Sequence, residues 1–180
     1  MRILIVIFLL ISNFALCQNA NNTVLSDTIW IKPGVGIDNL QFKKSLQSEV
    51  QNYRGMYFKK SDGEGIACGT GPSIYNFTTD FYSKANGIRF NFSTPWGTEP
   101  DKIKNQSKKL VSINLKQTKN ACLENGLCIG TSSYKDVVKK MRKPRRWRNK
   151  YFIAFYDKGI SFHFDTNRII YSIDVYEPQE

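Results

Sequence analysis

The chain has 180 residues, of which 41% are hydrophobic, 13% aromatic and 23% charged. This composition is typical of a globular protein and excludes a disordered tail or a fibrous chain. The 26 Lys and Arg residues outnumber the 15 Asp and Glu residues and give a formal net charge of +11, which favours anionic partners. His163 is the single histidine, so metal sites built from several histidines are excluded and one residue remains for histidine-dependent catalysis.

The first 17 residues have the features of a secretory signal peptide: a positive start, an apolar run over residues 3–11 and a small-residue pattern that ends at Cys17. The apolar run is shorter than the ~20 residues that a transmembrane helix needs, so we expect no transmembrane span in the mature chain. A lipid anchor on Cys17 is the alternative, disfavoured because the preceding residues are bulkier than those of lipoprotein signals. We predict a signal peptide over 1–17, a flexible lead-in over 18–27, and a secreted or periplasmic location.

Residues 28–117 are predicted to form the first of two related units. Leu46, Val50 and Tyr53 recur at positions i, i+4 and i+7, which indicates one apolar face of a short helix with Ser45 as its N-cap. Farther along, apolar residues alternate with polar ones, which indicates a strand. The alternating residues are Ile88, Phe90 and Phe92.

Two segments make the first unit longer than the second, and we expect both residues 63–72 and residues 94–105 to be insertion loops. The first segment is rich in glycine, but no Lys follows the glycines, so it does not match a phosphate-binding loop. A nucleophilic Cys68 activated by His163 is the sharpest enzymatic hypothesis, and a loop whose glycines serve turn geometry is the favoured alternative. Trp96 in the second segment is a candidate exposed anchor for a partner, with packing over a sheet as its alternative.

Residues 118–180 are predicted to form the second unit. Cys122 and Cys128 flank an Asn125-Gly126 pair, which favours a tight turn that brings the two thiols together. Disulfides persist in oxidising compartments, so we predict a Cys122–Cys128 bridge, with two buried free thiols as the alternative. Cys68 then has no partner within the mature chain.

A second short helix is expected from Tyr134 onward, with a capping box made by Ser133 and Asp136. Its apolar face comprises Tyr134, Val137, Val138 and Met141. Strands follow, in which Phe162 alternates with polar neighbours, and His163 lies on the opposite phase, where we expect it to be exposed.

A run of cations follows this helix: Lys139, Lys140, Arg142, Lys143, Arg145, Arg146, Arg148 and Lys150, with Trp147 inside it. Such a run attracts anionic surfaces, and arginine can hold a carboxylate or phosphate with two parallel hydrogen bonds. The alternative is a solvated loop, kept basic for solubility. Nucleic acid binding also suits arginines among aromatic residues, but export argues against it.

The two units repeat the same pattern. Gly-Ile-x-Phe-x-Phe occurs at residues 87–92 and 159–164, and Asn86-Gly87 and Lys158-Gly159 each predict the turn of an antiparallel hairpin. Four matched segments occur in the same order: 45–50 with 132–137, 81–84 with 155–158, 87–92 with 159–164, and 111–115 with 171–175. We therefore predict an α+β fold of two tandem repeats, each a short helix packed on a three-stranded antiparallel sheet, sharing one compact domain.

A helix that begins at a capped Ser and contains Glu49-Val50 or Asp136-Val137, followed by a small antiparallel sheet and then repeated, resembles the β-lactamase inhibitor protein-like fold. It is similar also to the fold of the outer-membrane assembly lipoprotein known as small protein A or BamE. The resemblance covers residues 36–176 at the level of pattern. It implies binding of other proteins at the envelope or outside the cell, without catalysis, and it carries no single functional residue across.

These observations predict an exported, non-catalytic binding module that needs no cofactor and no metal. The expected binding surface is aromatic and basic, built from the cation run, Trp147 and Trp96, and it faces a partner protein or an anionic envelope component. The alternatives are an enzyme that uses Cys68 with His163, and a structural or adhesive surface component held by charge.

Overall fold

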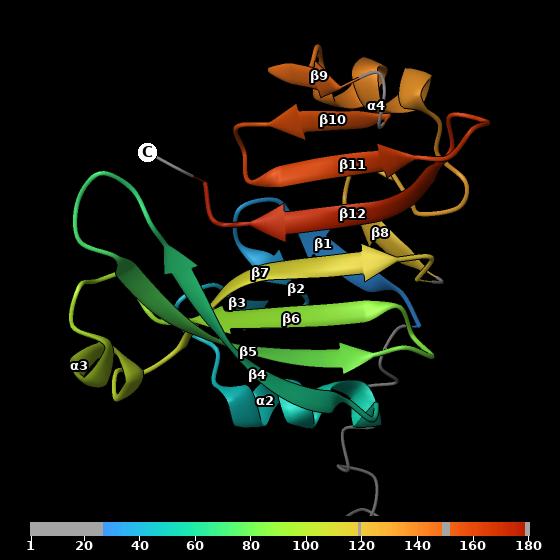
Figure 1. The fold of residues 1–180 in the computed structure, drawn as a ribbon. Coiled ribbons are helices and arrows are strands. Elements are labelled where there is room, and N and C mark those ends of the chain that lie inside the picture. The colour runs from blue at the N-terminus through green and yellow to red at the C-terminus, as the bar shows by residue number, and fades with distance from the viewer. Residues whose placement is uncertain (1–26, 119, 149–151, 179–180) are drawn as a thin grey trace, which may run out of the picture.

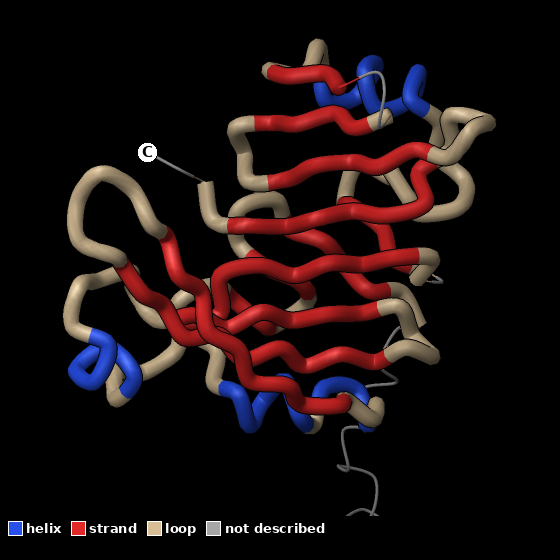
Figure 2. The backbone as a smooth tube through the Cα atoms, in the orientation of Figure 1, coloured by secondary structure: helices blue, strands red, loops and turns tan. Residues whose placement is uncertain are grey.

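The computed structural model describes residues 27–118, 120–148 and 152–178. The predicted signal peptide, almost all of the lead-in and Lys150 lie outside these ranges. The described chain is a mixed α+β fold, mostly strands in two sheets with a few short helices (Figures 1 and 2). The predicted α+β class is confirmed, but the sheets have eight and four strands, where sheets of three strands were expected.

The larger sheet is antiparallel throughout. In spatial order its strands are β4 (Lys59–Ala67), β5 (Ile74–Ser83), β6 (Ile88–Ser93), β7 (Lys109–Lys116), β12 (Ile170–Tyr176), β11 (Ile160–Phe164), β10 (Ile153–Tyr156) and β9 (Arg146–Arg148). The two predicted hairpins, β5–β6 and β10–β11, are confirmed. Each turns through a glycine with positive φ, Gly87 or Gly159, because a side chain there would meet a backbone oxygen at about 2 Å.

Two features of strand pairing occur in both halves of this sheet. Phe90 pairs with Ile113, and Phe162 pairs with Ile173. The register then shifts after Asn91 in β6 and after His163 in β11, so each half has an irregularity at the same distance from its hairpin turn. Bulges of this kind bend and twist a sheet at fixed positions.

The smaller sheet was not predicted. Its strands are β3 (Leu40–Gln41), β2 (Gly36–Ile37), β1 (Ile29–Lys32) and β8 (Ala121–Leu123) in spatial order. Strands of two to four residues are too short to show an alternating pattern, which explains why the sequence does not reveal them. Since β8 lies beside β1 in a parallel pair, the start of the second predicted unit completes a sheet that the first unit begins.

One face of the larger sheet is buried. In Figure 1 the small sheet lies behind its centre, with α2 (Gln47–Gln51) at the lower end and α4 (Tyr134–Met141) at the upper end. Four phenylalanines with at most 2% exposure fill the core between these layers: Phe90, Phe92, Phe162 and Phe164. The opposite face of the larger sheet is not covered by any helix of the described chain.

The two predicted helices, α2 and α4, begin differently. The predicted capping box of α4 is confirmed, since Ser133 N donates to Asp136 Oδ2 at 2.8 Å and Asp136 N donates to Ser133 Oγ at 3.3 Å. The predicted N-cap Ser45 is wrong, because its hydroxyl accepts a hydrogen bond from Gln41 N instead. Leu46 takes the capping position, with its amide bound to Glu49, and its side chain is exposed.

The glycine-rich segment 63–72 is not a loop over its whole length. Gly63 and Gly65 lie in β4, which pairs with β5 to form a two-stranded arm that runs out from the sheet beside α3 (Pro100–Lys104) (Figures 1 and 2). A Cβ on Gly65 would lie 2.1 Å from Asn76 Oδ1 and 3.1 Å from the Trp96 ring. Glycine is therefore required here for close approach of neighbouring side chains, and not for a turn.

Candidate functional site

The end of the larger sheet at β9 carries the arginines of the predicted cation run. Arg146 pairs with Phe155 and Arg148 pairs with Ile153, while Trp147 between them pairs with Ala154. Because side chains alternate along a strand, both arginines lie on the uncovered face of the sheet. Trp147 points the other way, onto Tyr134 of α4 and Phe164, with ring centroids 4.6 and 6.0 Å from its own.

The arginines line a groove of about 610 Å³ on this face. Its lining residues come from the segment before β9, from β9 itself, from β10 and its turn, and from the end of β12. They are Arg145, Arg146, Arg148, Phe155, Tyr156, Asp157 and Tyr176. We call this feature the arginine groove. It combines three guanidinium groups with aromatic walls.

The arginine groove has an excess of positive charge. Arg145 Nη1 forms an ion pair with Asp157 Oδ1 at 2.7 Å, and both side chains are exposed. Within the described ranges, no acidic group lies at ion-pair distance from Arg146 or Arg148. Arg148 instead lies over the Phe155 ring, 5.7 Å from its centroid, a cation–π contact that orients the guanidinium without neutralising it.

The two tyrosines of the groove add no negative charge at neutral pH. Burial raises the pKa of Tyr156 to about 12, and its hydroxyl donates to Arg142 O at 2.9 Å. Burial also raises the pKa of Tyr176, and the nearby carboxylates of Asp174 and Asp157 raise it further. The groove therefore stays cationic through the physiological pH range, which suits a carboxylate, phosphate or sulfate ligand.

A second polar feature lies on the same face, around Asp174 of β12. Asp174 Oδ2 binds His163 Nε2 at 2.5 Å and Ser161 Oγ at 3.2 Å, and Asp174 Oδ1 accepts from Asn114 Nδ2. Burial raises the pKa of Asp174, but the hydrogen bonds from His163, Asn114 and Ser161 outweigh burial and hold the pKa below its ordinary value. His163, expected to be exposed, is thus half-buried and bonded to a carboxylate.

Comparisons with protein-family models, with curated proteins and with solved structures find no match to this chain. The site is therefore argued from its own geometry. None of the helices within the described ranges is long and apolar enough to cross a membrane. The same part of the chain contains no group of three His, Cys, Asp or Glu side chains placed to hold a metal ion.

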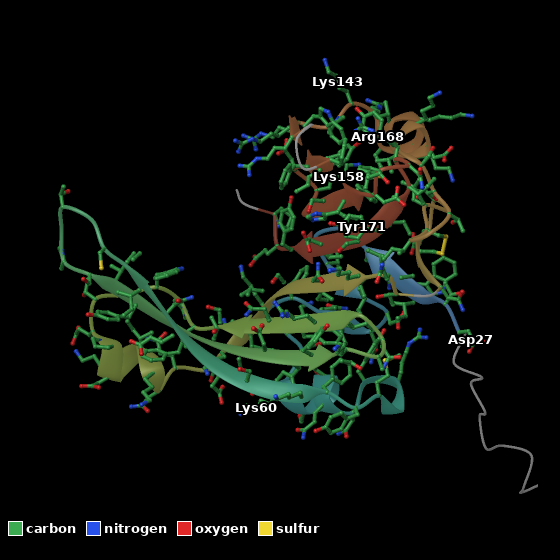
Figure 3. All side chains as sticks on the ribbon, turned by 45° about the vertical axis from the view of Figure 1, so that its right-hand side comes forward. Asp27, Lys60, Lys143, Lys158, Arg168 and Tyr171 are labelled. Carbon is green, nitrogen blue, oxygen red and sulfur yellow. A yellow bond between two sulfur atoms is a disulfide. The ribbon has the colours of Figure 1, made fainter. Side chains whose placement is uncertain are left out.

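The described cations of the predicted binding surface are divided between two places. Arg145, Arg146 and Arg148 meet in the arginine groove. The cations Lys139, Lys140, Arg142 and Lys143 are exposed on or just after α4, which packs on the other face of the sheet, and Figure 3 shows Lys143 at the far end of the molecule from Lys60. Lys140 Nζ donates to Asn125 O at 2.7 Å.

The two tryptophans named as binding candidates are not in the groove. Trp147 packs against the core. Trp96 is 51% exposed and lies over Gly65 on the arm, so both expectations for it, exposure and packing over the sheet, are partly realised. Lys150 lies outside the described residues.

The cysteines are placed as follows. Cys122 and Cys128 form a disulfide, with Cα atoms 4.1 Å apart. Cys68 is free and exposed, and its Sγ lies 3.5 Å from Ser73 Oγ. Cys68 follows β4 at one edge of the sheet, whereas His163 belongs to β11, which is five strand spacings, or roughly 24 Å, away. The structure does not bring these two residues together.

Tyr156 and Tyr176 are lining residues that the sequence did not single out, and Phe155 was not among the predicted binding residues. The distance of Phe155 from the turn at Gly159 indicates which face of the sheet its side chain takes. Tyr156 pairs with Ile160, the first residue of β11, so Phe155 lies one position farther back and faces the uncovered side. Tyr176 could have been placed by the same alternation, counted from buried Val175.

Proposed function

We propose that this protein is an exported, non-catalytic binding module that acts at or outside the cell envelope. It binds a partner protein or an anionic envelope component through the arginine groove. The observation that carries the proposal is the pair Arg146 and Arg148 on one uncovered face, beside aromatic walls, with no acidic partner in the described chain.

Electrostatics support this proposal. Two arginines that have no acidic partner within the described ranges raise the local potential and draw anionic ligands toward the groove. Guanidinium groups hold carboxylates and phosphates with paired, charge-assisted hydrogen bonds. Arginine and tyrosine are also the side chains that most often dominate the energy of binding interfaces, and both occur here with Phe155.

The cysteines support export. A disulfide between Cys122 and Cys128 suits an oxidising compartment such as the periplasm or the extracellular space. This agrees with the predicted signal peptide over residues 1–17, and both lead to the same proposed location.

Strand pairing supports an origin by tandem duplication. We infer that the units around β5–β6–β7 and β10–β11–β12 descend from one ancestral unit. The shared register of Phe90 with Ile113 and of Phe162 with Ile173, followed by an irregularity at the same step, is the supporting observation. A duplicated module that binds proteins is also what the resemblance to the β-lactamase inhibitor protein-like and BamE-like folds implies.

The test is retention on an anionic matrix. Arg146→Glu with Arg148→Glu should abolish or greatly weaken retention of the mature protein on heparin at low salt. Lys59→Glu with Lys84→Glu is the matched control, because it makes the same change in net charge at exposed positions toward the other end of the sheet. Equal losses in both variants would show that retention follows net charge alone and would overturn the proposal.

A further inference from the structure

We propose that β9 accepts an extended acidic segment of a partner protein as an added strand, with carboxylates at alternate positions bound to Arg146 and Arg148. This inference rests on the proposed function and names the partner of the same site. It depends on three observations: the free edge of β9, the spacing of its two arginines, and the contrast with the opposite edge of the sheet.

The first observation is the place of β9 in the sheet. Among the described residues it is the last strand of the eight and pairs only with β10. A strand at an edge presents unpaired backbone N–H and C=O groups toward its free side. An extended peptide can pair with these groups, and main-chain hydrogen bonds of this kind supply affinity without requiring a particular sequence.

Trp147 holds this edge in place. Its ring packs on Tyr134 at 4.6 Å and on Phe164 at 6.0 Å between centroids, and Arg168 lies 5.5 Å from its centroid. A strand anchored to the core through its central residue keeps its direction when a partner arrives. Less conformational entropy is then lost on binding.

The second observation is the spacing of the arginines. Arg146 and Arg148 are two residues apart on one face of β9, so their Cα atoms are separated by roughly 6.6 Å. Carboxylates at positions i and i+2 of an added strand have the same separation and point to the same face. Cross-strand neighbours lie about 5 Å apart, close enough for each carboxylate to reach one guanidinium group.

The third observation is the opposite edge of the sheet. β4 carries Asp62 and Glu64 beside Lys59 and Lys60, so its charges are mixed. Lys60 and Lys108 lie at ion-pair distance from Asp62. An acidic strand would meet like charges on β4, whereas both charged residues of β9 are arginines. The two edges therefore differ in the partner that they select.

A peptide explains the arrangement better than a lipid surface does. The arginines lie beside a groove bounded by Phe155 and Tyr176, and a groove at a strand edge fits a chain, whereas a membrane surface is broad and flat. A lipid headgroup also does not pair with the free backbone groups of β9 as an added strand does. Membrane binding is accordingly an outcome of the test.

The experiment compares two labelled peptides with the same composition and charge, acetyl-Thr-Glu-Thr-Glu-Thr-Glu-amide and acetyl-Glu-Glu-Thr-Thr-Glu-Thr-amide, of which only the first has glutamates at positions i and i+2. Fluorescence anisotropy with the mature protein at low salt should show that the alternating peptide binds about tenfold more tightly, since it adds a few backbone and ionic contacts in register. Arg146→Glu with Arg148→Glu should abolish this preference, and the Lys59→Glu with Lys84→Glu control should keep it.

Backbone pairing is tested with N-methylated forms of the alternating peptide. Amides of a strand point alternately to either side, so methylation of one alternate set should remove the preference, and methylation of the other set should leave it intact. Equal affinities for the two parent peptides, or no effect of either methylation, would overturn the added-strand inference.

The two proposals fail in different ways. If heparin retention depends on Arg146 and Arg148 but the peptides bind equally, the arginine groove binds anions without adding a strand, and only the further inference fails. If vesicles of phosphatidylglycerol and phosphatidylcholine bind through these arginines and the peptides do not, the partner is a lipid surface. If neither heparin, vesicles nor peptides depend on the two arginines, the proposed function fails as well.

Discussion

Asn114 and Asp174 lie directly opposite each other on β7 and β12, and Asn114 Nδ2 donates to Asp174 Oδ1 at 2.5 Å. They are the last residues of two similar triplets, Ser-Ile-Asn at 112–114 and Ser-Ile-Asp at 172–174. Around them, Ile113 pairs with Val175 and Leu115 pairs with Ile173. The sheet is therefore joined at its centre by matching segments that pair with each other, as the two sides of a two-fold interface do.

This junction makes Asp174 important for stability. Asp174→Asn removes the carboxylate that binds His163 and Ser161, and we expect a loss of about 1–3 kcal/mol in the free energy of unfolding at pH 7. Urea denaturation measures it. Asp157→Asn, an exposed substitution, is the control, and an equal effect of the two changes would contradict the role given to Asp174.

The contribution of Asp174 should depend on pH. Its pKa is lower in the folded chain than in the unfolded chain, where it is near ~4. The stabilisation is therefore complete above that unfolded-state value and is lost as the pH falls through the lower folded-state pKa. The difference in stability between the wild type and Asp174→Asn should narrow between pH 5 and pH 2. A constant difference over this range would show that ionisation of Asp174 is not involved.

The proposed duplication predicts similar energetic roles for matched core positions in the two units. Phe90 and Phe162 are completely buried and occupy the same register in their strands. Phe90→Ala and Phe162→Ala should each cost about 3–5 kcal/mol, measured by urea denaturation. A small cost for one and a large cost for the other would argue against two equivalent units.

The sequence match between Phe81 and Phe155 misleads by one position. Phe81 pairs with Phe90 and is buried, whereas Phe155 pairs with Ser161 and faces the arginine groove. The turn after β5 has four residues and the turn after β10 has three, so the two strands are displaced by one residue. A shift of one residue moves a side chain to the other face of a sheet.

This displacement gives a prediction. Phe81→Ala should destabilise the protein by about 3–5 kcal/mol and leave heparin retention of the folded fraction unchanged. Phe155→Ala should cost far less stability and should weaken retention, because it removes the ring under Arg148. Thermal unfolding and heparin chromatography measure the two effects. The reverse order would contradict the assignment of Phe155 to the binding surface.

The disulfide supplies a further prediction. Cys122 and Cys128 close a short loop, and the chain-entropy model gives about 2 kcal/mol for a loop of this length. Cys122→Ser with Cys128→Ser should lower stability by roughly that amount. In the wild-type mature chain, a thiol reagent should modify Cys68 alone, as found by mass spectrometry. Labelling of Cys122 or Cys128 without reductant would contradict the bridge.

The parts of the fold that the sequence predicts are those with strong local signals. The hairpin turns at Gly87 and Gly159, the alternating phenylalanines and the capping box of Ser133 depend on a few adjacent residues. The small sheet could not be predicted, because its short strands are stabilised by pairing between residues distant in sequence, such as Ile29 with Ala121. Its formation depends on tertiary contacts and not on local preference.

The candidate site also has features that the local sequence predicts and features that depend on tertiary structure. The cation run identified Arg146 and Arg148, but a run of charges in sequence does not specify which side chains share a face. Strand alternation separates these arginines from Trp147, and the end of α4 places Lys139 and Lys140 on the other side of the sheet. The predicted exposure of His163 is wrong because strand pairing brings its partner Asp174 near.

The proposed function places ligand binding on the uncovered face at β9 and β10. Hydrogen–deuterium exchange of the mature protein, with and without heparin, tests this most directly. We expect slower exchange in peptides that cover residues 145–148 and 153–157, with no change in residues 59–67 of β4. Protection confined to β4 and the arm, or the absence of any local protection while heparin is bound, would contradict the claim.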